Sequence, residues 1–253
     1  MSISLDLTGK VALITGASQG IGEQIARTFH AANAQVVANH PGTAATQRDT
    51  ERLVEELNGS RPGSAEAVAA DVSSPEAVQS MMRRIQQSRG GLDIVINNAA
   101  IIRDRTLSKM SLEDWKSVID VDLSGVFYCC KFGMEIMRDG GAIVSLGSIA
   151  AIQGFYGQAN YAAAKAGVQA MMRVLSREGA KRGIRANAIA PGVIDTAMAA
   201  TIPDKVRAEM LQNIPLGRWG TKAEIAHVAL FLCSPLASYV TGQTLEVNGG
   251  WRG

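Results

Sequence analysis

The stretch "KVALITGASQGIG", residues 10–22, joins a short apolar run to a glycine-rich loop. The loop places Gly16, Gly20 and Gly22 at G-x-x-x-G-x-G spacing, ahead of the amphipathic segment "IGEQIARTFHAA". Glycines at such positions permit a tight turn, and the amides at the start of the following helix favour a pyrophosphate group. The stretch therefore predicts the first strand, loop and helix of a dinucleotide-binding unit.

Six further apolar runs of strand length alternate with helix-like segments, at 34–39, 65–70, 92–97, 142–147, 184–190 and 243–248. Most of these runs are nearly continuous in hydrophobic residues, as expected for strands that are covered on both faces. We therefore expect one α/β domain over residues 1–253. It would be Rossmann-like and doubly wound, with a seven-stranded, mainly parallel sheet and helices on both faces.

Capping patterns predict where two of the helices begin. The stretch "SSPE" (73–76) offers serine caps and an early proline. Ser73-x-x-Glu76 and Ser111-x-x-Asp114 both have the spacing of a capping box, the second with the shorter acid. The segment 192–216 is longer than an ordinary connection between a strand and a helix. We interpret it as a substrate lid.

The charge balance argues against nucleic acid and membrane partners. Lys plus Arg number 25 and Asp plus Glu number 23, and the formal net charge of +2 is too small for a nucleic-acid or membrane-binding surface. No apolar run is long enough to cross a bilayer, and the first residues lack the features of a signal peptide. We expect small-molecule partners and copies of the chain itself.

The cysteines and histidines indicate neither a disulfide framework nor a metal centre. Cys129, Cys130 and Cys233 form no C-x-x-C pair, which favours a reducing, cytoplasmic location. The three histidines share no metal-ligand spacing, so we expect no catalytic metal.

The alanine-rich stretch "ANYAAAKAG", residues 159–167, places Tyr161 and Lys165 four positions apart. On a helix these two side chains emerge on the same face. One interpretation is a half-buried tyrosine beside a solvated lysine. The other is that the ammonium group stabilises a phenolate, so that the tyrosine acts as a general acid or base. The pair by itself does not decide between them.

Several motifs occur together in a fixed order: the glycine loop, "NNAA" (97–100), "SLGS" (145–148), the Tyr161 and Lys165 pair, and "APG" (190–192). With this set, the sequence resembles the short-chain dehydrogenase/reductase superfamily along nearly its whole length, and most closely the 3-oxoacyl-[acyl-carrier-protein] reductases. The resemblance implies a cytoplasmic, homotetrameric NAD(P)(H)-dependent oxidoreductase that interconverts a ketone and a secondary alcohol. It implies a 3-oxoacyl thioester substrate first, and a sugar, polyol or other small carbonyl compound as the alternative.

The same resemblance assigns catalytic roles. Tyr161 would exchange a proton with the substrate oxygen, Ser148 would hydrogen-bond that oxygen, and Lys165 would bind the ribose and lower the pKa of Tyr161. Asp122 stands where the family usually has an asparagine that supports a water relay to the lysine, and we expect it to keep that role. The implied cofactor contacts, besides Tyr161 and Lys165, are Gly16, Ser18, Gln19, Gly20, Ile21, Gly22, Asn39, His40, Asp71, Val72, Asn98, Ala99, Pro191, Gly192, Ile194 and Thr196.

The end of the second predicted strand bears on the choice of cofactor. An NAD-preferring site has an acidic residue there, whereas this chain has Asn39 and His40. Gln19 occupies a place where NADP-preferring relatives often carry a cation, which leaves His40 or Arg48 as the phosphate partner. We expect NADP(H) to be preferred, with NAD(H) possible.

An acyl carrier protein is a further candidate partner. The connection "RDGG" (138–141) is shorter than in many carrier-protein reductases, where this stretch carries a basic contact to the acidic carrier. Lys181 and Arg182 are present in the other basic patch that the family uses.

Two interpretations from other functional classes stay open. "GASQG" is a literal G-x-S-x-G, which could make Ser18 the nucleophile of an α/β-hydrolase, although no strand precedes it and only His227 lies late in the chain. A non-catalytic nucleotide-binding regulator would use the same fold without turnover. The presence of Ser148, Tyr161 and Lys165 argues against a regulator.

Overall fold

The computed structural model describes residues 5–196 and 204–251, and these residues form one seven-stranded sheet. Its order is β3-β2-β1-β4-β5-β6-β7, and every neighbouring pair is parallel. The strands are β1 (Val11–Ile14), β2 (Gln35–His40), β3 (Ala65–Ala69), β4 (Leu92–Asn97), β5 (Met137–Leu146), β6 (Arg185–Pro191) and β7 (Thr244–Val247). The doubly wound prediction is confirmed, with the sheet wholly rather than mainly parallel.

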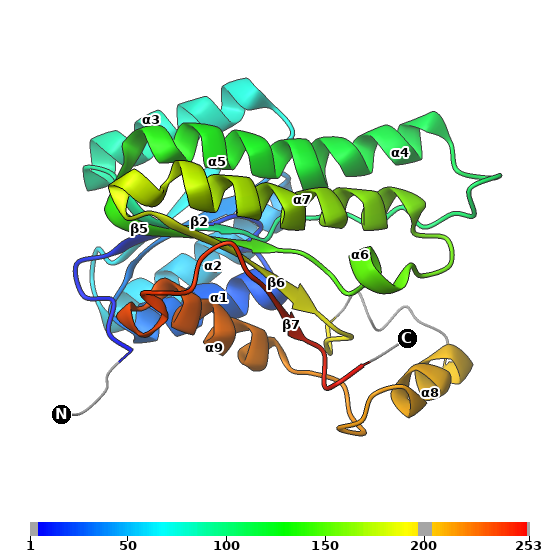
Figure 1. Ribbon diagram of the computed structural model, residues 1–253. Helices are drawn as coiled ribbons and strands as arrows, with labels where there is room; N and C mark the ends of the chain where they lie inside the picture. The colour runs from blue at the N-terminus through cyan, green and yellow to red at the C-terminus, as the bar shows by residue number, and fades with distance from the viewer. Residues whose placement is uncertain (1–4, 197–203, 252–253) are drawn as a thin grey trace.

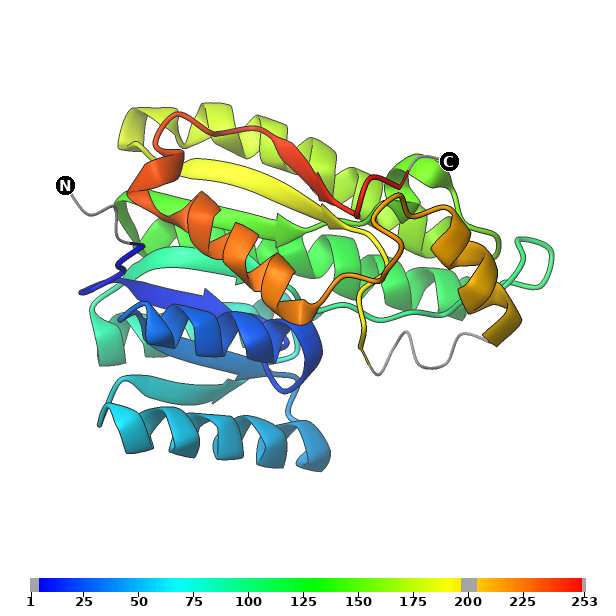
Figure 2. The same ribbon diagram turned by 90° about the horizontal axis from the view of Figure 1, so that it is seen from below.

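Helices cover both faces of the sheet (Figure 1). One face carries α1 (Gly20–Ala31), α2 (Ala44–Ser60) and α9 (Lys222–Cys233), seen across the sheet in Figure 2. The other carries α3 (Pro75–Arg89), α5 (Gly125–Ile136) and α7 (Ala159–Glu178). The helix α4 (Leu112–Ile119) runs into α5 through a π-helical turn, Asp120–Ser124. Two short helices, α6 (Ala150–Gln153) and α8 (Asp204–Gln212), lie beyond the arrowheads of the strands (Figure 1).

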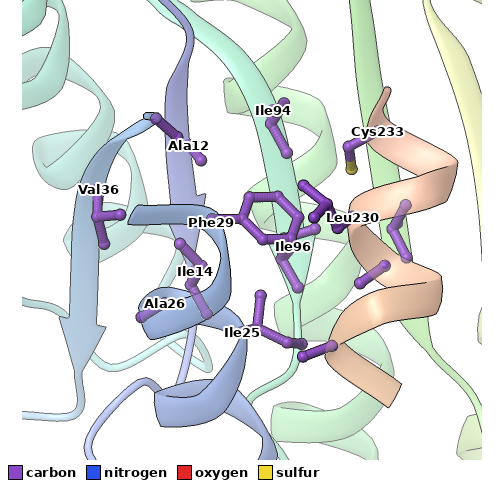
Figure 3. Packing of buried hydrophobic residues seen from close by; sticks show 14 of the residues in the cluster. Ala12, Ile14, Ile25, Ala26, Phe29, Val36, Ile94, Ile96, Leu230 and Cys233 are labelled. Carbon is purple, nitrogen blue, oxygen red and sulfur yellow. The ribbon is translucent and has the colours of Figure 1, made fainter. Parts of the chain in front are cut away.

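A hydrophobic cluster under α1 and α9 fixes these helices to the sheet. Phe29 is fully buried at its centre, among side chains of β1, β4 and α9 that include Ile14, Ile96 and Leu230 (Figure 3). Burying a side chain of this size contributes about 1.5–3 kcal/mol. The helix that follows the glycine loop is thereby held firmly over β1.

The sequence-based boundaries agree with the strands to within a residue or two, except at β5. That strand begins at Met137 rather than at residue 142, because the pairing with β4 shifts register between Leu92 and Ile94. The stretch 138–141, expected to be a connection, therefore lies inside an irregular strand.

Of the two predicted capping boxes, one is confirmed and one is wrong. Ser111 and Asp114 form the full box at the start of α4. At α3 the N-cap is Ser74, which accepts from the amide of Ala77 at 3.1 Å, because Pro75 occupies the first helical position. Ser73 instead hydrogen-bonds the carboxylate of Asp71.

The topology places the chain's functional motifs along one edge. Because all strands are parallel, their carboxyl ends meet at the same side of the sheet, and the strand order reverses between β1 and β4. Ligands of such sheets bind at this switch point. Within the described parts of the chain, no helix has the length and hydropathy needed to span a bilayer.

Candidate active site

The glycine loop between β1 and α1 is packed tightly against the end of β4. Gly16 has a φ of +63°, and a methyl group there would lie 2.9 Å from the Cα of Ala99. A methyl group at Gly22 would lie only 2.3 Å from the carbonyl oxygen of Gly16. The Asn98 amide donates to the carbonyls of Thr15 and Gly16 at 2.9 and 3.0 Å. Asn98 therefore braces the loop through its side chain.

The start of α1 fits a pyrophosphate group. Gly20 has a φ of +66°, and a methyl group there would meet no atom within 4 Å, so the backbone faces open space at this point. Gln19 is the N-cap residue, yet its exposed side chain makes no capping hydrogen bond. The first amides and the positive end of the helix dipole are thus directed at the carboxyl edge, where an anion is favoured. Ser18 and Ile21 flank this point.

The two residues that end β2 are engaged within the protein. Asn39 is 1% exposed. Its amide nitrogen lies 3.0–3.3 Å from the carbonyls of His40, Val68 and Ala70, and its oxygen accepts from the amide of Gly16 at 3.4 Å. The imidazole of His40 is 3% exposed and accepts from the amide of Gly42 at 3.2 Å. Their contact with a cofactor stays a prediction, and the side chain of Asn39 holds the glycine loop to β2.

The remaining predicted cofactor contacts lie along the same edge. Asp71 is exposed after β3, and Val72 is buried against Gly125. Pro191, the last residue of β6, is buried, and a methyl group at Gly192 would lie 2.7 Å from the Cα of Asn248. Ile194 is buried and bridges to Gly220, and Thr196 is the last described residue of this segment.

Ser148, Tyr161 and Lys165 converge beyond the ends of β5 and β6. The Lys165 ammonium nitrogen lies 5.4 Å from the centre of the Tyr161 ring, and the Ser148 side chain is close enough to lower the pKa of Tyr161. Tyr161 is half-buried, whereas Lys165 is only 2% exposed. The interpretation of a solvated lysine is therefore wrong, because this lysine is buried beside the tyrosine.

Two amides fix this geometry. Gln169 donates to the carbonyl of Ser148 at 3.0 Å, across from α7 to the strand end. The fully buried Asn160 accepts from the amide of Tyr161 at 2.8 Å and donates to the carbonyls of Arg103 and Asp114 at 3.1 Å each. The start of α7 is thereby tied to the loop after β4. Sequence reasoning missed both residues, since their role depends on contacts between distant segments.

The protein's own groups raise the pKa of Tyr161 overall. Burial is the largest cause, Lys165 lowers the pKa, Asp122 raises it, Ser148 lowers it and Asp104 raises it. The expected contribution of Lys165 is present with the expected sign. The pKa of Tyr161 is nevertheless raised, because burial and the two carboxylates outweigh Lys165 and Ser148.

Asp122 lies in the π-helical turn and is fully buried. One carboxylate oxygen accepts from the amide of Ile101 at 2.9 Å, and the other lies 3.3 Å from the ammonium nitrogen of Lys165. Burial lowers the pKa of Lys165, but Asp122 and Tyr161 together outweigh that effect, so that the pKa is raised. Burial raises the pKa of Asp122 against the lowering effect of Lys165, and the two buried groups face each other within ion-pair distance. The water relay expected of Asp122 stays a prediction.

Asp104 was not singled out from the sequence. It is half-buried in the loop after β4 and accepts from the side chain of Gln158 at 2.9 Å. Burial raises the pKa of its carboxyl group, against smaller lowering effects of Gln158 and Arg105. No sequence motif marks it, and only the fold brings its charge close enough to act on Tyr161.

An apolar cluster adjoins Ser148 through Ile149, the next residue in the chain. Ile149, Ile214 and Trp251 are buried together, and Phe155 and Met210 pack against them. Met210 belongs to α8, so part of the predicted lid contacts the region next to Ser148. Residues 197–203 of that lid lie outside the described residues, and its function as a lid stays a prediction.

The hydrolase interpretation of Ser18 finds no histidine partner in the described structure. His30 pairs with the hydroxyl of Ser64 at 2.7 Å, His40 accepts from Gly42, and His227 is exposed on α9. Ser18 itself is buried in the glycine loop.

Most of the basic side chains that could contact a carrier protein already form hydrogen bonds within this chain. Arg138 donates to the carboxylate of Asp93 at 2.5 Å. Arg182 donates to Asp139 at 2.8 Å and to the carbonyl of Met134 at 2.7 Å. Lys181 is exposed.

Comparison with known proteins places this geometry in a family. A family model of the short-chain dehydrogenase type, described as enoyl-(acyl carrier protein) reductase, matches residues 16–252. The chain belongs to the short-chain dehydrogenase/reductase family. It is therefore an oxidoreductase.

Relatives of this short-chain dehydrogenase/reductase match it over nearly the full length. It is 41% identical over 248 residues to the 3-oxoacyl-[acyl-carrier-protein] reductase FabG of Escherichia coli (strain K12), covering 97% of this chain and 98% of the relative. A short-chain glucose/ribitol dehydrogenase from Brucella melitensis superposes with a TM-score of 0.92 at 35% identity, covering 98% of each chain. A blue fluorescent protein from a metagenomic library, solved with NADPH, has a TM-score of 0.93 at 32% identity and covers 98% of this chain and 100% of its own.

Proposed function

We propose that the protein is an NADP(H)-dependent reductase of 3-oxoacyl thioesters. The observation that carries the proposal is the convergence of Ser148, Tyr161 and Lys165 at the same edge of the sheet as the glycine loop. The proposal is supported by the full-length relationship to 3-oxoacyl-[acyl-carrier-protein] reductases.

In this reduction the phenol of Tyr161 donates a proton to the oxygen of the substrate ketone. The Ser148 hydroxyl hydrogen-bonds the same oxygen and orients it toward the phenol. Burial keeps the pKa of Tyr161 above its ordinary value, so the ring hydroxyl is protonated at neutral pH and serves as the acid. The ammonium group of Lys165 stabilises the phenolate that is left behind. When bound, the reduced nicotinamide would supply the hydride.

The preference for NADP(H) is supported by the end of β2. Asn39 and His40 place no carboxylate at the strand end itself, so the acid that favours NAD at this position is missing. Burial lowers the pKa of His40, which keeps the imidazole neutral and favours Arg48, exposed on α2, as the phosphate partner. The relative of similar fold that was solved with NADPH also supports this choice.

An acyl carrier protein is the proposed partner that presents the thioester. The names of the curated relatives support it, and the exposed Lys181 is the basic contact that the chain offers.

We further propose a homotetramer, supported by large apolar side chains on the outer helices: Trp115 on α4, Phe127 on α5 and Val174 on α7 are 40%, 48% and 54% exposed. The three buried free thiols agree with a cytoplasmic location.

A second candidate is a sugar or polyol dehydrogenase. The structural likeness to a glucose/ribitol dehydrogenase favours it. The apolar cluster beside Ser148 argues for an aliphatic substrate instead, because Phe155 and Trp251 offer ring surfaces rather than hydrogen bonds.

Steady-state assays that follow the reduced nicotinamide decide between these candidates. Acetoacetyl-CoA, a panel of sugars and polyols, and small ketones are compared with NADPH and with NADH. We expect the highest kcat/KM for acetoacetyl-CoA with NADPH. A higher kcat/KM for any sugar or polyol would contradict the thioester substrate, and equal efficiency with NADH would contradict the cofactor preference.

A further inference from the structure

Asp122 occupies an unusual backbone setting. It is the central residue of the turn Asp120–Ser124, where the helix that joins α4 to α5 widens to π geometry. Such turns occur mostly as single insertions in α-helices and often at functional sites. Here the turn brings the Asp122 side chain inward, where it is fully buried.

One oxygen of the Asp122 carboxylate is hydrogen-bonded to the backbone, and the other faces a cation. One oxygen accepts from the amide of Ile101, in the loop after β4, at 2.9 Å. The other lies 3.3 Å from the ammonium nitrogen of Lys165 and has no hydrogen-bond partner among the described residues. An amide at this place could accept from Ile101 equally well, but it would carry no charge to set against the lysine.

The lysine side chain is thereby restrained from two directions. Its ammonium group lies between the carboxylate of Asp122 and the ring of Tyr161, at 3.3 Å from the carboxylate and 5.4 Å from the ring centre. With only 2% of Lys165 exposed, water screens these interactions weakly. The charge of Asp122 is therefore felt at Tyr161 as well as at Lys165.

We propose that Asp122 is a positioning residue whose carboxylate anchors the ammonium group of Lys165 and sets the pH range in which Tyr161 donates its proton. The inference rests on the proposed function only in that Tyr161 is the acid. An uncharged residue at 122 would leave Lys165 unopposed beside the phenol, and Tyr161 would ionise at lower pH.

The charged groups around Tyr161 make the direction of the effect clear. Lys165 favours the phenolate, whereas Asp122 from the π-helical turn and Asp104 from the loop after β4 oppose it. Removing the Asp122 charge shifts this balance toward the phenolate. Because reduction needs the protonated phenol, activity is then lost at lower pH than in the wild type.

The test compares Asp122→Asn with Asp120→Asn. Asparagine keeps the acceptor for Ile101 and removes only the charge. Asp120 lies in the same turn but pairs outward with Lys116 at 2.5 Å, so its variant controls for a general change of charge. Asp122→Ser, smaller and also uncharged, is the second variant should the asparagine protein fail to fold.

Two readouts are taken for each protein. The first is the pH profile of kcat/KM, measured with whichever carbonyl compound the wild type reduces. The second, independent of turnover, is the phenolate absorbance during a pH titration, from which the titration of the same protein carrying Tyr161→Phe is subtracted. A wild type that does not reduce acetoacetyl-CoA would contradict the proposed substrate and leave the second readout intact.

We expect the alkaline limb of the profile and the Tyr161 titration to move to lower pH in Asp122→Asn and in Asp122→Ser, and to stay in place in Asp120→Asn. A Tyr161 titration unchanged by the loss of the Asp122 charge would overturn the proposal. An equal shift in Asp120→Asn would overturn it too, since the effect would then be one of overall charge.

Discussion

Lys165 and Asp122 form an ion pair with 3.3 Å between their charged atoms, and both side chains are almost entirely removed from water. Removing one partner of such a pair leaves the other as an uncompensated buried charge, which typically costs about 3–5 kcal/mol. We therefore expect Lys165→Met to lower the free energy of unfolding by about that amount, as measured by chemical denaturation.

The double variant Lys165→Met with Asp122→Asn is the matched control. It removes both charges, so most of the lost stability returns while catalysis stays impaired. A double variant as unstable as Lys165→Met alone would show that the carboxylate is not what destabilises the single variant.

Asn39 is expected to be a structural residue whose replacement does not switch the cofactor. In the wild type, three carbonyl groups accept hydrogen bonds from the side-chain amide of Asn39. In Asn39→Asp these carbonyls would instead face a buried carboxylate. Each unsatisfied buried group costs about 1–3 kcal/mol, so we expect a loss of at least about 3 kcal/mol. Denaturation curves and the Kd values for NADH and NADPH check this. Asn213→Asp, at an exposed amide, is the control and should leave the free energy of unfolding and both Kd values unchanged. A stable Asn39→Asp protein that prefers NADH would refute the structural role.

The glycine loop makes a steric prediction about nucleotide binding. A methyl group in Gly22→Ala would approach the carbonyl of Gly16 to 2.3 Å and the amide of Asn98 to 2.4 Å, so the loop must open. We expect a weakened affinity for NADPH, by about tenfold or more, since the helix N-terminus that holds the phosphates moves. Gly59→Ala, in α2 with nothing within 4 Å, is the control and should bind NADPH normally. Fluorescence titration measures both, and equal affinities would show that the loop tolerates the methyl group.

Burial of His30 predicts an acid-sensitive stability. Its ring shares one hydrogen bond with the hydroxyl of Ser64, at 2.7 Å. Burial is the larger cause that lowers the pKa of the imidazole below its ordinary 6.5, and the positive charge of Arg61 lowers it further. The unfolded chain therefore binds a proton that the folded chain excludes as the pH falls below 6.5. Stability is complete above this pH and declines below it. Thermal unfolding across this range should show a smaller decline for His30→Gln than for the wild type, and parallel declines would contradict the assignment.

The sequence predicted the fold well because the signals that define it are local. Continuous apolar runs, the glycine turn and the Ser111 capping box each act within a few residues, and each occurs where the pattern placed it. The errors arose where a neighbour decides the outcome. The early start of β5 depends on a register shift against β4, and the cap at α3 moved to Ser74 because Pro75 fixes the first helical position.

In the candidate site too, local motifs could be predicted from the sequence, whereas contacts between distant segments could not. Ser148, Tyr161 and Lys165 could be identified from motif spacing, and the structure brings them together. The burial of Lys165, the use of Asn39 to hold the glycine loop and the influence of Asp104 on Tyr161 arise between segments far apart in the chain. The net effect on the pKa of Tyr161 could not be predicted from the pair, since two residues say nothing about the burial around them.

The ring hydroxyl of Tyr161 carries the central claim, and Tyr161→Phe removes only that atom. Oxidation of NADPH by acetoacetyl-CoA is measured for the variant and the wild type, alongside the Kd for NADPH. The account predicts a fall in kcat of about 10²-fold or more with the Kd unchanged, as for the loss of a general acid. Undiminished turnover in the phenylalanine protein would contradict the account.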